Sequence, residues 1–129
     1  MLEILERRNR GKRRGAELEE RTLCFATEVI RLVGAFDASE VSKVIGRQLL
    51  RSGTSIGANY REANRAESSS DFAHKVAIAL KEAAETEYWL LLCNRTNVGA
   101  PPAVTTLLSE VDELLAILST ILRRARRVS

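Results

Sequence analysis

The stretch from Phe72 to Cys93, FAHKVAIALKEAAETEYWLLLC, decides the fold. Its apolar and small side chains recur at alternating steps of four and three residues, which places them on one face of an α-helix. The residues on this face are Phe72, Val76, Ala79, Ala83, Thr86, Leu90 and Cys93. The segment therefore predicts an amphipathic helix that buries a continuous apolar seam.

Three further segments repeat this rhythm. Their apolar positions are Leu18, Thr22, Phe25, Val29, Leu32 and Phe36 in the first, Val41, Ile45, Leu49, Ile56 and Tyr60 in the second, and Val104, Leu108, Val111, Leu115, Leu118 and Leu122 in the last. Ser39 and Ser68 are candidate N-caps, and Asn97 to Pro102 forms a helix breaker. No segment alternates as a β-strand would.

These segments predict an all-α protein, an antiparallel up-down-up-down four-helix bundle. After a basic N-terminal extension over residues 1–16, the bundle is expected over residues 17–127. Its helices are expected at about residues 17–36, 39–64, 69–95 and 101–127.

The composition is that of one soluble domain. The chain has 129 residues, of which 45% are hydrophobic, 29% charged and 5% aromatic. The longest apolar run, Tyr88 to Cys93, is far shorter than the roughly 18 residues that span a bilayer. The two cysteines, Cys24 and Cys93, lie in helical patterns and are interpreted as buried free thiols. We therefore expect a cytoplasmic protein without a membrane segment.

The charge is unevenly distributed along the chain. The net charge is +3, but residues 1–14 carry +4, residues 123–129 carry +4, and the body between them carries −5. Because the first helix begins and the fourth ends at the same end of such a bundle, we expect the two clusters to converge on one face. Basic clusters of this kind are typical of polyanion binding. The candidate nucleic-acid-binding residues are Arg7, Arg8, Arg10, Lys12, Arg13, Arg14, Arg123, Arg124, Arg126 and Arg127.

The motifs of catalysis are absent from the sequence. The one histidine, His74, cannot form the paired Glu-x-x-His motifs of a di-iron bundle, and no phosphate-binding loop is present. We therefore predict no metal, no cofactor and no enzymatic activity. An unrecognised catalytic site around Arg51, Glu82 and Glu85 is the alternative.

The second helical segment is unusually polar and glycine-rich. Gly46, Gly53 and Gly57 lie on one stripe, and each costs about 1 kcal/mol relative to alanine in a helix interior. Close packing against the alanine-rich third segment would compensate for this cost. Polar side chains nearby would then need partners. The predicted structural polar network comprises Gln48, Arg51, Ser55 and Asn59 with Glu82 and Glu85.

Residues 47–92 resemble the bacterial four-helix-bundle proteins encoded by 23S rRNA intervening sequences. The resemblance rests on QLLRSGTSIGANYREA from Gln48, on Asp71-Phe72, and on IALKEA and ETEYWL further along. More distantly, the chain is similar to the accessory variability protein of diversity-generating retroelements. The resemblance implies a homopentamer, no enzymatic activity, and nucleic-acid binding through basic surfaces.

These observations support a leading hypothesis and two alternatives. The leading one is a non-enzymatic oligomer that binds RNA or DNA through arginine–phosphate contacts. The alternatives are a structural or protein-interaction scaffold whose basic ends only solubilise it, and the enzyme described above. Tyr88, Trp89, Leu91 and Leu92 surround Leu90, so the third helix is apolar on more than one face, which predicts a homo-oligomer.

Overall fold

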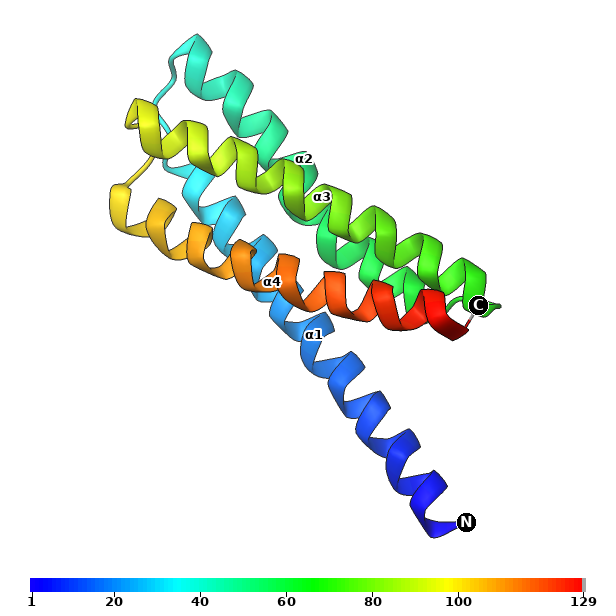
Figure 1. Cartoon of the computed structure of the whole chain (residues 1–129). Helices are drawn as coiled ribbons and strands as arrows, with labels where there is room; N and C mark the ends of the chain where they lie inside the picture. Colours follow the sequence, from blue (N-terminus) through cyan, green and yellow to red (C-terminus); the bar gives the residue numbers. More distant parts are fainter. Residues whose placement is uncertain (129) are drawn as a thin grey trace.

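The structure, a computed structural model, contains four α-helices (Figure 1). It describes the backbone of residues 1–128 and the side chains of residues 1–11 and 15–127. The helices are α1 (Leu2–Gly34), α2 (Glu40–Ala63), α3 (Ser69–Thr96) and α4 (Pro101–Val128). Each helix packs against its neighbours in the chain, and α1 also contacts α4, so the predicted four-helix bundle is confirmed. Within the described backbone no residue forms a strand.

The first helix starts earlier than the expected position near residue 17. It runs without interruption from Leu2 to Gly34, and its first half extends beyond the other helices (Figure 1). The basic segment lacks an apolar seam, but it is rich in leucine, glutamate, arginine and lysine, which are strong helix formers. A helix already nucleated in the bundle propagates cheaply into such a segment.

The N-caps and the helix break that the sequence predicts at the other helix ends are confirmed. The backbone N–H groups of Ser42 and Asp71 donate to the hydroxyl oxygens of Ser39 and Ser68, both at 3.1 Å. Asn97 adopts a left-handed conformation with φ of 58° after α3. Pro101 then begins α4, where a missing N–H costs nothing.

The predicted seams form the core, and Val41 is the one seam residue that is exposed. Most seam residues of all four helices are buried. Val41 is 60% exposed, because it lies on the flank of α2 rather than on the face that packs inward. Cys24 is also exposed, which corrects the expectation of two buried thiols, since it lies between Leu23 and Phe25 and only Phe25 belongs to the seam.

The glycine stripe of α2 faces α1, which corrects the expectation that it faces α3. A Cβ atom at Gly46 would lie 2.9 Å from Val33, and one at Gly53 would lie 3.0 Å from Val29. A Cβ atom at Gly57 would lie 2.9 Å from the Thr22 hydroxyl oxygen. These glycines therefore allow α1 to approach α2 closely along the length of the contact.

The contact at Gly57 is the most constrained of the three. Thr22 is fully buried, and its hydroxyl donates to the carbonyl oxygens of Leu18 and Glu19 at 2.9 and 3.0 Å. The Thr22 Cβ atom, which is fixed to the α1 backbone, would lie only 3.1 Å from a Cβ atom at Gly57. A larger side chain at Gly57 must therefore displace the α1 backbone.

This geometry predicts that Gly57→Ala destabilises the bundle although alanine is the better helix former. Overpacking costs about 1–3 kcal/mol, which exceeds the gain in helix propensity of about 1 kcal/mol. Urea unfolding should show a net loss for Gly57→Ala and a larger one for Gly57→Val. Gly34→Ala is the matched control, because nothing lies within 4 Å of its added Cβ atom. A Gly57→Ala variant more stable than the wild type would contradict this account of the contact.

Candidate nucleic-acid interface

The N-terminal basic cluster lies on the part of α1 that extends past the bundle, residues 2–14, which we call the arm. Arg7, Arg8 and Arg10 are exposed on it. Among the side chains that the structure describes, none forms a hydrogen bond or ion pair with these three arginines. The side chains of Lys12, Arg13 and Arg14, which were also predicted to bind nucleic acid, lie outside the described residues. The arm thus presents cationic groups to solvent.

The C-terminal basic cluster forms the last turns of α4. Arg123, Arg124, Arg126 and Arg127 are all exposed, and Arg123 Nη2 donates to Thr120 Oγ1 at 3.4 Å. Cations at this position also favour the negative end of the helix dipole, a contribution of about 0.3–1 kcal/mol each. The arginines therefore have a stabilising role that is compatible with binding phosphate.

The two clusters share one end of the bundle, but they do not form one face. Gly11 and Gly15 at the base of the arm line the same hollow as Arg124. Beyond this point the arm continues straight and carries the N-terminus away from the C-terminus (Figure 1). The expectation of a single basic face is corrected, because the N-terminal cluster belongs to a rigid helix rather than to a tail that folds over the bundle.

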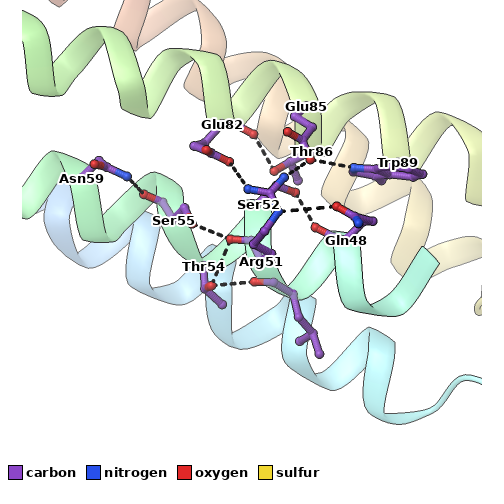
Figure 2. Close-up of polar contacts among 11 residues, drawn as sticks. Gln48, Arg51, Ser52, Thr54, Ser55, Asn59, Glu82, Glu85, Thr86 and Trp89 are labelled. Carbon is purple, nitrogen blue, oxygen red and sulfur yellow. Dashed lines mark hydrogen bonds and ion pairs between the residues drawn. The ribbon is translucent and has the colours of Figure 1, made fainter. Parts of the chain in front are cut away.

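The polar network of α2 and α3 centres on Arg51 (Figure 2). Arg51 Nη1 lies 3.2 Å from Glu82 Oε2, and its Nη2 donates to Glu85 Oε2. Trp89 Nε1 donates to the same Glu85 oxygen at 3.0 Å. These two donors lower the pKa of Glu85, with the Trp89 hydrogen bond as the larger cause. Arg51 Nε also donates to Gln48 Oε1, at 3.5 Å.

The other predicted members of this network do not reach the carboxylates. Ser55 Oγ donates to the Arg51 carbonyl at 2.5 Å, and Asn59 Nδ2 donates to the Ser55 carbonyl at 2.9 Å. Both therefore bind the backbone of their own helix (Figure 2). The Arg51 side chain is 49% exposed, so the network lies at the surface of the α2–α3 contact rather than inside the bundle.

The site offers little that could perform catalysis. The charge of Arg51 is balanced by two carboxylates, and His74 is exposed. No cluster of three or more His, Cys, Asp or Glu side chains suited to a metal ion occurs in the part of the chain that the structure describes. In the same part, no helix combines the length and the apolar character needed to cross a bilayer.

The structure contains two ion-pair clusters that were not predicted from the sequence. Arg21 Nε and Nη2 donate to the two carboxylate oxygens of Glu110 at 2.7 Å, and Glu113 also accepts from Nη2. Glu19 lies 3.4 Å from Arg61 and 3.6 Å from Arg65. Each cluster joins residues that are more than 40 positions apart in the sequence, and no residue spacing indicates such a pair.

Comparison with known proteins decides the family. The sequence profile of the family described as 23S rRNA-intervening sequence protein matches residues 16–120. The chain belongs to this family. A solved structure from Bacteroides thetaiotaomicron, described as a protein with unknown function from the S23 ribosomal protein family, is 40% identical with a TM-score of 0.75. The match covers 81% of this chain and 96% of that chain. No curated protein matches the sequence.

The family match divides the candidate residues into two groups. The Arg51 network lies inside the matched region, whereas both basic clusters lie outside residues 16–120. The family resemblance inferred from residues 47–92 is thus confirmed. The arm and the terminal arginines lie outside the region that matches the family.

The Arg51 network predicts a modest effect of Arg51→Ala on stability. The variant leaves Glu82, whose side chain is 18% exposed, and Glu85 without their cation. Because Arg51 itself is half exposed, the loss should be at most about 1 kcal/mol in urea unfolding. A double-mutant cycle with Glu82→Gln isolates the pair, and Arg95→Ala is a control. A loss of several kcal/mol would contradict a surface position for the network.

The Arg21–Glu110 pair predicts a loss of stability in acid. The hydrogen bond from Arg21 lowers the pKa of Glu110 below its ordinary value of 4.5. The pair's contribution to the free energy of unfolding is therefore complete above the ordinary pKa of a glutamate, and it is lost as the pH falls through the lowered pKa of Glu110. Urea unfolding from pH 7 to pH 3 should show a shallower decline for Glu110→Gln than for the wild type. If the stability of the two proteins declined identically with pH, the pair would contribute nothing to the stability of the bundle.

Proposed function

We propose that this protein is a non-enzymatic, oligomeric four-helix bundle that binds structured RNA or DNA through its basic ends. The observation that carries the proposal is the separation of charge in space. Residues 1–14 and 123–129 carry +4 each at one end of the bundle, whereas the body carries −5. An anionic body is repelled by a polyanion, so phosphate contacts are restricted to that end. A cytoplasmic location is part of the proposal.

The chemistry of the exposed side chains supports phosphate binding. Sixteen of the 20 basic residues are arginines, whose planar fork pairs with phosphate oxygens through two hydrogen bonds. Arg7, Arg8 and Arg10 are exposed on a helix, which spaces their charges at fixed intervals along a rod. Contacts of this kind bind the backbone and carry no base sequence information, so the binding is nonspecific.

Exposed apolar side chains on two separate faces support the oligomer. Leu23 and Ile30 are exposed on the outer face of α1, and Val44, Tyr88 and Leu91 are exposed on α2 and α3. Two different patches on one chain favour a head-to-tail contact, which closes into a ring if the rotation permits. From the family resemblance we expect that ring to be a pentamer.

A structural or protein-interaction scaffold without nucleic-acid binding is the second candidate. The C-terminal arginines have a role at the helix end without any phosphate, and the exposed apolar patches suit protein contacts equally well. The two functions differ in one respect. Only the first requires affinity for polyanions that falls steeply with salt.

The proposed function predicts a steep salt dependence of binding to a structured RNA hairpin, measured by fluorescence anisotropy. The logarithm of the association constant should fall linearly with the logarithm of salt concentration, by about 0.7–0.9 per phosphate contact. Deleting residues 1–14 should weaken binding and reduce this slope. Replacing the four C-terminal arginines by alanine should do the same.

Arg95→Ala provides the control for this experiment. Arg95 is an exposed arginine in the last turn of α3, at the opposite end of the bundle, so its removal should leave the slope unchanged. The absence of binding at low salt would favour the scaffold. Binding with a slope that survives the loss of both clusters would place the interface elsewhere on the bundle.

A further inference from the structure

The contact between α1 and α4 leaves a groove along one side of the bundle. α1 packs mainly on α2 and touches α4 at few places. Hollows of about 740, 650 and 390 Å³ lie along the α1–α4 junction. The first also reaches Tyr60 and Phe72 at the end of the bundle, and Arg21, paired with Glu110 of α4, bridges the two helices between the first and second hollows. Apolar side chains line each of them: Ile117 and Ile121 in the first, Phe25 and Leu107 in the second, and Leu32 and Leu107 in the third.

The arm of the same chain does not cover this groove. α1 is one unbroken helix from Leu2 to Gly34, so its first half continues the direction of its second half and leaves the bundle (Figure 1). Nevertheless the tip of the arm is apolar. Leu2 is 72% exposed and Leu5 is 46% exposed, and Met1 and Ile4 are exposed beside them.

The arm matches the groove in length. A helix rises 1.5 Å per residue, so residues 2–14 span about 18 Å. The seam of α1 that borders the groove, from Leu18 to Leu32, spans about 21 Å by the same rise. The insertion of a helix's apolar side chains into an apolar groove is a recurrent mode of recognition between proteins. In the arm these side chains are confined to residues 1–5.

The arm also matches the groove in charge. The two helix segments that flank the groove, residues 17–34 and 101–119, carry a net charge of −5, which equals the whole negative excess of the body. Residues 1–14, which include the arm, carry +4. The same charge opposes the pairing of two arms with each other, because two segments of +4 repel each other. The complementary partner of an arm is thus the α1–α4 face of a bundle.

We propose that the arm of one copy docks into the α1–α4 groove of a second copy, with Leu2 and Leu5 facing the hollows. This inference rests on the oligomeric part of the proposed function. It is also compatible with nucleic-acid binding. At 100° per residue, Arg7 and Arg10 lie about 160° and 140° from Leu5 around the helix, so they point outward from a docked arm, whereas Arg8 lies about 60° from Leu5.

The exposed thiol of Cys24 reports on occupation of the groove. Cys24 lines the middle hollow, together with Phe25 and Glu110. Cys93 is buried, and burial raises the pKa of its thiol to about 11, so it contributes little to the reaction with a disulfide reagent at pH 8. The rate of thiol modification in the native protein therefore measures access to Cys24.

The experiment mixes two full-length variants without nucleic acid. The acceptor carries Leu2→Glu and Leu5→Glu, which disable its own arm, and it keeps Cys24. The donor carries Cys24→Ser and a native arm. After prolonged incubation with excess donor, modification of the acceptor thiol by DTNB should slow about fivefold or more, as expected when ligand exceeds the dissociation constant several times.

The control donors decide what covers the thiol. A Cys24→Ser donor that also carries Leu2→Glu and Leu5→Glu should give no protection. A Cys24→Ser donor with Val41→Glu should protect like the native arm, because Val41 is exposed on α2, away from the groove. The proposal is overturned if the native donor gives no protection, or if the donor with the altered tip protects equally.

Light scattering on the same samples separates this inference from the proposed function. An oligomer whose Cys24 stays fully reactive overturns arm docking and leaves the oligomeric scaffold standing. A monomer at micromolar concentration overturns both the docked arm and the oligomeric part of the proposed function. RNA binding is measured independently, so its loss or presence does not enter the outcome.

Discussion

The close approach of α1 to the glycine stripe of α2 is the constraint on which the rest of the structure depends. At Gly46, Gly53 and Gly57 the space of a side chain is occupied by residues of α1. The helix penalty of about 1 kcal/mol for each glycine is offset by the packing this approach permits. Because α1 is drawn toward α2, its contact with α4 is reduced to a few places, among them the Arg21–Glu110 pair.

Two functional features follow from this position of α1. The reduced contact with α4 opens the apolar groove, and the uninterrupted helix carries the N-terminal arginines past the end of the bundle (Figure 1). The family core, matched over residues 16–120, supplies the bundle and the Arg51 network. The segments outside this match, at both ends of the chain, supply the positive charge. The basic segments therefore lie at one end of an acidic body.

The sequence was sufficient for the fold because helical periodicity and caps are local signals. The seams, the caps at Ser39 and Ser68 and the break before Pro101 all appear in the structure. Which helix faces the glycines depends on how α2 is rotated in the bundle, and spacing along one helix does not determine that rotation. The pairing of Arg51 with Glu82 and Glu85 was predicted, whereas the positions of Ser55 and Asn59 were not, because their own backbone offers acceptors.

The central claim is that α1 is one rigid helix, fixed on α2 and continuous through the arm. A distance measurement by pulsed electron paramagnetic resonance tests it most directly, with spin labels on Ile4→Cys and on the native Cys24, diluted with unlabelled protein. Twenty residues of unbroken helix separate the labels by about 30 Å, so a narrow distribution near that distance is expected. A broad distribution, or one centred at a much shorter distance, would show a break near Gly11 or Gly15 and would contradict the account.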